Sequence, residues 1–277
     1  MEVGRNFKNI KTYNKGMSKS LSDKLFFLNH LPKERDYLFV DFGCADGILI
    51  NSLYEIYKNN CYFIGYDISE AMIGLAKSKF NYPAQNVNFT SSWNDVERKL
   101  NNTKFKKVLI LSSVIHEIYS YANSEDDITN FWDKVISNNF DYICIRDMMC
   151  SDDIDRNTNL TLLGYFNTRG RNVNNTLNRQ SKEFEYTWGD LNNNKNFIHF
   201  LLKYRYTINW DRELHENYFP IYIDQFINRM LNTKRSNYSL SYFERFRVPF
   251  LEKCWNDDFG ISIEDYTHVK MIFELLK

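Results

Sequence analysis

The stretch Val40-Asp41-Phe42-Gly43-Cys44-Ala45-Asp46-Gly47 decides the fold of this chain. Before it lies an apolar run, residues 37–40, and after it the apolar residues of 49–56 repeat with the spacing of one helical face. A second apolar run, residues 62–66, ends at Asp67. Strand, glycine-bearing turn, helix, strand and acid in this order predict the first half of a nucleotide-binding α/β unit.

The glycine spacing indicates the kind of nucleotide. A dinucleotide fingerprint reads G-x-G-x-x-G/A, and its three positions here hold Gly43, Ala45 and Ile48. The second glycine is the one that lets a pyrophosphate approach the backbone. Alanine at that place favours a ligand with an adenosine but no phosphates, while the carboxylate of Asp67 can accept hydrogen bonds from both ribose hydroxyls.

At this point the chain resembles the class I S-adenosylmethionine (SAM)-dependent methyltransferases, whose first motif is an acidic strand end followed by G-x-x-x-G, as in Asp41 to Gly47. The resemblance covers residues 37–147 with motif support and residues 238–277 more loosely. It implies an α/β Rossmann-like sheet with helices on both faces and an antiparallel last strand. It also implies SAM as the cofactor and no metal.

The resemblance further implies a set of cofactor-binding residues near the strand ends. They are Asp41, Gly43, Ala45, Gly47, Asp67, Ile68, Met72, Ser92, Trp93, Ser112 and Ser113. Asp41 either holds the turn or reaches the cofactor's ammonium through water, and Trp93 either packs on the adenine or belongs to the core. The acid that reads the adenine amino group in the family is absent from residues 90–93, which leaves the adenine contacts open.

The tip of the fourth predicted strand, Ser112-Ser113-Val114-Ile115-His116-Glu117, holds the catalytic candidates. His116 with Glu117 resembles the strand-tip histidine of many small-molecule members of the family, and an imidazole there can take a proton from a nucleophile. The alternative is a histidine that caps the sheet end by a structural hydrogen bond. The N/D-P-P-Y/F motif of enzymes that methylate base amino groups is absent here, and Asp147 after the fifth strand is a candidate for orienting substrate.

Composition bounds the class of protein. The chain has 277 residues, 43% of them hydrophobic and 17% aromatic, with a formal net charge of zero, which argues against a globally basic nucleic-acid binder. The five cysteines form no C-x-x-C pair, so we expect neither a disulfide framework nor a zinc site. No membrane-length apolar run and no secretory signal are visible, so the expected location is cytoplasmic, with no membrane partner.

Four regions are expected along the chain: a helical segment or lid over residues 1–36, the SAM-binding core over 37–150, a helical cap insertion over 151–235, and closing strands over 236–277. The predicted strands are 37–42, 61–66, 87–89, 107–111, 141–146, 238–243 and 268–273. Ser69 is expected to cap one helix and Pro249 to begin another.

Residues 156–182 carry five basic side chains and no acid, which predicts a mobile basic loop. Such a loop is either simply solvated or grips phosphate.

Taken together, the motifs and the composition predict a SAM-dependent methyltransferase acting on an oxygen, nitrogen or sulfur atom of a small molecule. The alternatives are an RNA or other nucleic-acid methyltransferase that uses this loop, and a non-catalytic SAM-binding protein. The sequence leaves the oligomeric state open.

Overall fold

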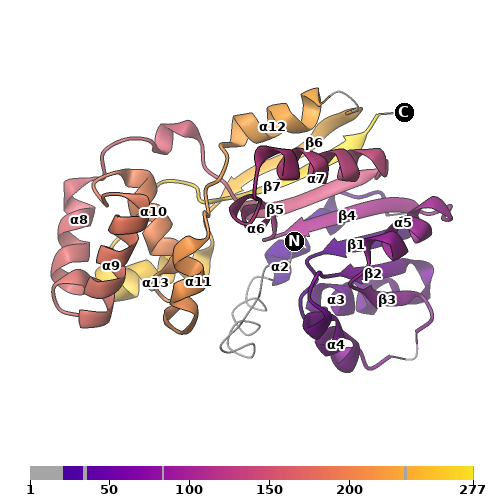
Figure 1. Cartoon of the computed structure of the whole chain (residues 1–277), viewed down its shortest axis with the longest axis horizontal. Helices are drawn as coiled ribbons and strands as arrows, with labels where there is room; N and C mark the ends of the chain where they lie inside the picture. The colour runs from indigo at the N-terminus through magenta and orange to yellow at the C-terminus, as the bar shows by residue number, and fades with distance from the viewer. Residues whose placement is uncertain (1–20, 34–35, 83, 234–235, 277) are drawn as a thin grey trace.

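The computed structural model describes residues 21–33, 36–82, 84–233 and 236–276. In Figure 1 a twisted sheet with flanking helices forms one lobe, and a group of helices forms a second lobe beside it. Of the expected lid, only 21–33 and Asp36 fall within this description, and the part over residues 1–19 lies outside it.

A seven-stranded sheet carries the first lobe, in the order β3-β2-β1-β4-β5-β7-β6. The first five strands in this order pair in parallel, while β7 runs antiparallel to both β5 and β6. The strands are β1 (Tyr37–Phe42), β2 (Tyr62–Tyr66), β3 (Val87–Thr90), β4 (Lys106–Ser112), β5 (Tyr142–Met148), β6 (Tyr238–Phe246) and β7 (His268–Leu275). The predicted α/β sheet with an antiparallel last strand is confirmed, with strand ends within a few residues of those predicted.

Alternate residues of each strand enter two different apolar clusters, because successive side chains of a strand point to opposite faces. Leu38 and Val40 pack with α5, α7 and α12 on one face of the sheet. Tyr37 and Phe39 pack with α3 and α4 on the other. These helices are α3 (Ile48–Tyr57), α4 (Glu70–Lys79), α5 (Trp93–Asn101), α7 (Glu125–Ser137) and α12 (Ile223–Asn232). Helices on both faces are thus confirmed, and the strand ends between them are left to build a site.

The cap has an aromatic core of its own, which includes Phe166, Phe197 and Phe200. Its helices are α8 (Leu160–Phe166), the π-helical turn η4 (Asn167–Arg171), α9 (Asn175–Trp188), α10 (Asn194–Lys203), α11 (Trp210–His215) and α13 (Pro249–Phe259). The packing departs from the boundaries expected at 151–235. Helix α12, expected in the cap, packs on the sheet through Phe226, and α13, expected among the closing strands, packs in the cap through Trp255 and Phe259.

The prediction of a mobile basic loop over residues 156–182 is wrong, because this segment is largely helical. Its asparagines cap helices: the side chain of Asn159 accepts a hydrogen bond from the Thr161 N–H at 2.8 Å, and that of Asn174 accepts one from the Leu177 N–H at 3.1 Å. Asparagine favours such N-cap positions as strongly as it favours loops. Several of the basic side chains also have acidic partners, including Glu185 for Arg171 and Asp265 for Arg156.

Candidate functional site

The turn after β1 has the backbone that its glycines require. Gly43 and Gly47 have φ of 78° and 76°, in the left-handed region that favours glycine, and Ala45 also has a positive φ, of 45°. A Cβ atom on Gly43 would lie 2.9 Å from Val114 Cγ2. The turn is fastened to β2, because the Gly43 and Cys44 N–H groups donate to the Tyr66 carbonyl at 2.8 and 2.9 Å.

Asp67 joins this turn to the start of α4. Its Oδ2 accepts the Ala45 N–H at 3.0 Å and its Oδ1 accepts the Ser69 N–H at 2.9 Å, and the side chain is fully buried. Ser69 in turn caps α4 through the Met72 N–H, as predicted. The acid at the tip of β2 therefore fixes both segments that approach the same pocket.

A pocket that opens to solvent lies where β1 and β4 end, beside the glycine turn. Seven of the predicted site residues line it: Asp41, Gly43, Ala45, Met72, Ser112, Ser113 and Glu117. Six others that line it were not predicted: Lys24, Cys44, Asp46, Ile48, Leu49 and Val114. The structure thus brings together the ends of two strands, the glycine turn and α4, which lie far apart in the sequence.

Six predicted site residues are placed elsewhere, and Trp93, the last of them, is described separately below. Gly47 is the residue before α3, Asp67 lies beneath the turn, and Ile68 is half exposed. Ser92 precedes α5, where its N–H donates to Thr90 Oγ1. His116 lies behind Glu117 in α6 (Ile115–Ser120), among the residues described below.

Trp93 belongs to the core and not to the pocket. Its ring packs edge-on against Phe42 and Tyr66, with ring centroids 5.6 and 5.3 Å away, and its Nε1–H donates to Glu97. Of the two roles that the sequence left open for this residue, the structure shows the core role. Trp93 is therefore not available to a ligand in the pocket.

Asp41 and Lys24 both line the pocket, and the charge of each affects the pKa of the other. Burial raises the pKa of Asp41 to about 7, although the positive charge of Lys24 opposes this rise and the charges of Asp67 and Asp46 add to it. Burial and the charge of Arg146 lower the pKa of Lys24 to about 8. The pocket therefore holds an acid and a base whose charges respond to what binds beside them.

Lys24 comes from α2 (Leu21–Lys24), in the segment expected to form a lid. A sequence signal for its burial exists, because Leu21, Lys24 and Leu28 share one helical stripe at i, i+3 and i+7. A lysine within an apolar stripe of a helix is a candidate for a charged side chain that points into the protein. That segment continues as the 3-10 helix η1 (Phe26–Asn29), so the expected helix is shorter and changes pitch.

Behind Glu117, Asp147 holds the start of α6 in place. Its Oδ2 accepts the Val114 and Ile115 N–H groups at 2.8 and 2.6 Å, and its Oδ1 lies 2.7 Å from His116 Nδ1. The carboxylate is an acceptor, so Nδ1 carries the proton and Nε2 is turned the other way. Asp147 was expected to orient substrate, and here it orients His116 instead.

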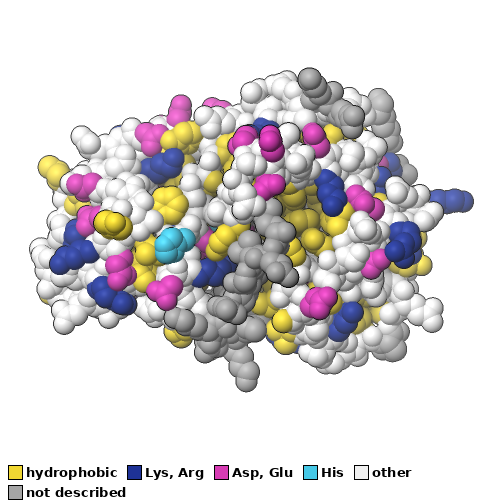
Figure 2. All heavy atoms as spheres, viewed as in Figure 1, with side chains coloured by type: hydrophobic (Ala, Val, Ile, Leu, Met, Phe, Trp, Pro, Cys, Tyr) yellow, Lys and Arg dark blue, Asp and Glu magenta, His cyan; other side chains and the backbone are white. Residues whose placement is uncertain are grey.

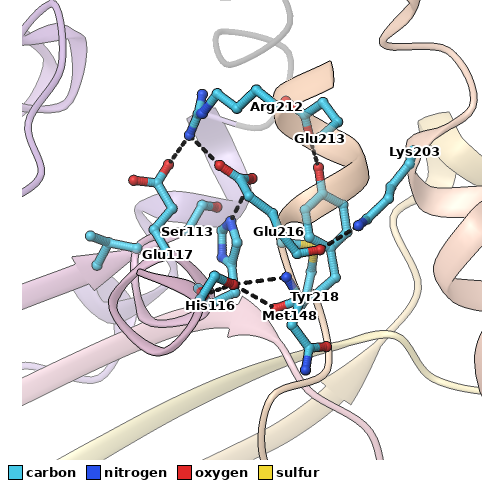
Figure 3. Close-up of polar contacts among 12 residues, drawn as sticks. Ser113, His116, Glu117, Met148, Lys203, Arg212, Glu213, Glu216 and Tyr218 are labelled. Atoms are coloured by element: carbon cyan, nitrogen blue, oxygen red, sulfur yellow. Dashed lines mark hydrogen bonds and ion pairs between the residues drawn. The ribbon is translucent and has the colours of Figure 1, made fainter. Parts of the chain in front are cut away.

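The cap supplies the other side of this cluster. Arg212 Nη2 lies 2.9 Å from Glu117 Oε1 and 2.5 Å from Glu216 Oε1, so one guanidinium bridges the core and the cap (Figure 3). Tyr121 OH also donates to Glu216 Oε1, at 3.0 Å. His116 Nε2 faces Glu216 Oε2 at 3.9 Å. Arg212 and Glu216 had no signal in the sequence, because they lie about a hundred residues from the strand tip that they meet.

The surroundings of His116 favour its protonated form. Burial by itself would lower the pKa of His116, but the charge of Asp147 and the hydrogen bond to it, with the charges of Glu216 and Glu117, raise it to about 9. For Asp147, burial acts to raise the pKa, but the charge and hydrogen bond of His116 hold it below its usual value. The two groups therefore form a buried ion pair.

Comparisons with known proteins give only distant structural likenesses. No family model matches it, and a search of curated proteins finds no match. The plantazolicin methyltransferase BpumL, solved with SAH, is 12% identical over 99% of this chain and 92% of its own, with a TM-score of 0.49. The cyclopropane synthase MmaA2 from Mycobacterium tuberculosis is 9% identical over 92% and 83%, with a TM-score of 0.49. The small RNA methyltransferase HEN1 is 18% identical over 94% of this chain but 26% of its own, with a TM-score of 0.48.

Likenesses at this level say nothing about substrate. The strand order with its antiparallel β7 and the glycine turn after β1 define a Rossmann-like α/β fold of the class I methyltransferase type. Within the described residues, no helix combines the length and the apolar character that crossing a membrane requires.

Proposed function

We propose that this protein is a SAM-dependent methyltransferase acting on an oxygen, nitrogen or sulfur atom of a small molecule. The observation that supports it most is the pocket itself, where the glycine turn after β1, the start of α4 and the tip of β4 converge. In open α/β sheets, ligands bind at the carboxyl ends of the strands. This chain builds a pocket at that place, lined by apolar side chains together with charged and hydroxyl groups.

The residues present suit such a cofactor. Ser112 Oγ is buried at the pocket wall without a hydrogen-bond partner among the described residues, as a group that serves a ligand would be. Asp41 offers a carboxylate to the cofactor's ammonium, and Lys24 offers an ammonium to its carboxylate. Met72 with Ile48 is assigned to the adenine, and the buried Asp67 is assigned to holding the glycine turn and the start of α4 beside the ribose.

When bound, SAM supplies a methyl group on a sulfonium: the acceptor's lone pair forms the new bond to carbon, and the carbon–sulfur bond breaks with its electrons passing to sulfur. The chain's own contribution is alignment of the acceptor and exclusion of water, which together are worth up to about 7–11 kcal/mol in ideal cases. The carboxylates of Glu117 and Glu216 take the acceptor's proton and pass it to solvent, while the pKa of His116, raised to about 9 by Asp147 and its neighbours, makes the imidazole a poor proton acceptor. Glu117 suits this place because it belongs both to the pocket wall and to the cluster.

A small-molecule acceptor is favoured over RNA by the charges of the cap. On the face shown in Figure 2, Lys and Arg side chains over the cap alternate with Asp and Glu and form no continuous basic surface. Arg171 and Arg156 have carboxylate partners within 3 Å, and Arg169 donates to the Phe259 carbonyl. Paired arginines have less to gain from phosphates.

We accordingly expect weak, non-saturating RNA binding at physiological salt. The measurement is fluorescence anisotropy of a labelled single-stranded RNA across a salt series, for the wild type and for Arg169, Arg171 and Arg179 changed together to Gln. Tight, salt-sensitive binding that the triple change abolishes would establish the nucleic-acid alternative. Incubation of the enzyme and methyl-labelled SAM with a cell extract gives a second check, because label should enter the small-molecule fraction and not RNA or protein.

The cofactor pocket also predicts a pH dependence. The ammonium of S-adenosylhomocysteine (SAH) favours the charged form of Asp41, whose pKa is about 7 in the presence of Lys24, Asp46 and Asp67. Affinity for SAH should therefore rise between pH 6 and 7.5, on the order of fivefold. The reason is that the carboxyl of Asp41 is charged in few of the molecules at pH 6 and in most of them at pH 7.5. The same raised pKa makes the folded state lose stability as the pH rises through this range.

Isothermal titration of SAH at each pH, with the wild type and Asp41→Asn, measures this effect. The Asn variant carries no charge at either pH and should show a flat profile. A wild-type affinity that stays constant, or a variant that keeps the rise, would remove Asp41 from the cofactor's ammonium.

A further inference from the structure

The structure places a mixed group of metal-ligand side chains between the sheet and the cap. His116 and Glu117 come from α6 and Glu216 comes from the segment after α11, and all three are buried. In contrast to the metal-free site expected from the sequence, we propose that this group, called the junction cluster, binds one divalent metal ion that holds the methyl acceptor by an oxygen atom. The metal site stands on the described residues alone, whereas the role of the ion in methyl transfer rests on the proposed function.

The distances within the junction cluster suit a shared ion. One ligand atom from each of the three side chains can be chosen so that all lie within 4.8 Å of one another. His116 Nε2 and Glu216 Oε2 are 3.9 Å apart, too far for a hydrogen bond. Nitrogen and oxygen ligands that share one ion at about 2.0–2.2 Å lie roughly 3–4.4 Å from each other, so small side-chain movements complete the site.

In His116 and Glu216, the nitrogen or oxygen atom that would not bind the ion has a partner of its own. His116 Nδ1 is fixed by Asp147, the arrangement that orients an imidazole for a metal through Nε2. Glu216 Oε1 is held by Arg212 and Tyr121, which turns its Oε2 toward His116 (Figure 3). The ligand atoms therefore converge on one point because their partners lie on the outside.

The charges of the junction cluster also suit a divalent ion. The carboxylates of Glu117 and Glu216 share the guanidinium of Arg212, and a third carboxylate, that of Asp147, lies against His116. The opposite charges of the neighbouring Lys203 and Glu213 cancel, so they add nothing to this sum. A divalent cation would balance the two negative charges that Arg212 leaves over in this buried site.

The donor set and the position define what the ion would do. One imidazole and two carboxylates favour Mn²⁺, Fe²⁺ or Zn²⁺, and three protein ligands leave positions open for another molecule. Glu117 also lines the cofactor pocket, so those positions would face the methyl group. An acceptor hydroxyl bound there loses its proton to solvent more readily, because the ion lowers its pKa, and its oxygen then forms the bond to the methyl carbon. The acceptor is accordingly assigned to the hydroxyl compounds.

The test uses manganese alone, added as MnCl₂ to the full-length protein after treatment with a chelator. Electron paramagnetic resonance (EPR) follows the loss of the free Mn²⁺ signal, and we expect one ion bound per chain. Glu216→Gln should weaken this binding at least about tenfold. The matched control is Glu185→Gln, which removes a cap carboxylate paired with Arg171 and should leave Mn²⁺ binding unchanged. Should the Glu216 variant not fold, pulsed EPR of the wild type still decides, because nitrogen coupling from His116 must be present.

Binding of SAH is measured in parallel without metal, so that the two proposals fail separately. Mn²⁺ bound with nitrogen coupling but no SAH bound would support the metal site and remove its role in methyl transfer. SAH bound but no Mn²⁺, or Mn²⁺ held equally by the wild type and Glu216→Gln without nitrogen coupling, would overturn the metal site. In that case the cluster is held together by Arg212 and a proton.

Discussion

Replacing Asp67 with alanine is expected to weaken SAH binding at least about tenfold, a loss of around 1.4 kcal/mol. The change removes the carboxylate that the sequence assigns to the ribose hydroxyls and that the structure places beneath the glycine turn. It also removes the acceptor for the Ala45 and Ser69 N–H groups, which hold the glycine turn and the start of α4. Each buried N–H left unsatisfied costs about 1–3 kcal/mol, so the free energy of unfolding should fall as well. Isothermal titration and thermal melting measure the two effects.

Asp127→Ala is the matched control, because Asp127 also accepts a backbone N–H, from Asn123 at 3.0 Å, but does not line the pocket. It should bind SAH as the wild type does. If Asp67→Ala folds and binds SAH with unchanged affinity, the ribose lies elsewhere and the turn does not need this carboxylate.

Gly47→Ala is expected to be strongly destabilising, by about 2–4 kcal/mol, and to reduce SAH affinity. A Cβ at this position would lie 2.8 Å from the ring of Phe89 and 3.1 Å from Ala76 Cβ, and the φ of 76° is unfavourable for alanine. Left-handed backbone costs about 1–2 kcal/mol and crowding in a packed core about 1–3 kcal/mol. The melting temperature should fall by roughly 5–15 °C.

The same substitution at Gly74 is the control. Gly74 lies exposed in the middle of α4, and a Cβ there would meet nothing within 4 Å. Gly74→Ala should leave the melting temperature unchanged or raise it, since alanine favours a helix by up to about 1 kcal/mol over glycine. If the melting temperature of Gly47→Ala equals that of Gly74→Ala, the turn tolerates a side chain at residue 47.

The core of the fold could be predicted from the sequence because its signals are local. The apolar run of β1, the glycines that follow it and Asp67 lie within one βαβ unit, where spacing alone fixes their relation. The same holds for the capping of α4 by Ser69 and for Pro249 at the start of α13. Periodicity and turn chemistry are properties of neighbouring residues, so they can be read before the structure is known.

The boundaries of the cap and the cluster around His116 could not be predicted, because they depend on contacts between residues far apart in the sequence. Helices α12 and α13 both have apolar faces, and nothing in their periodicity says that one packs on the sheet and the other in the cap. Glu216 and Arg212 meet α6 only because the cap folds back over the strand tips. The asparagines of residues 156–182 suit caps and loops alike, and tertiary burial of Leu163 and Phe166 decides for helices.

The most direct test of the central claim is isothermal titration of the full-length protein with SAH and, separately, with NAD. The missing pyrophosphate glycine at Ala45 and the acid at Asp67 predict that SAH binds at one site per chain and that NAD produces no binding heat. Binding of NAD more tightly than SAH would contradict the account, because the pocket would then belong to a dinucleotide and not to a methyl donor.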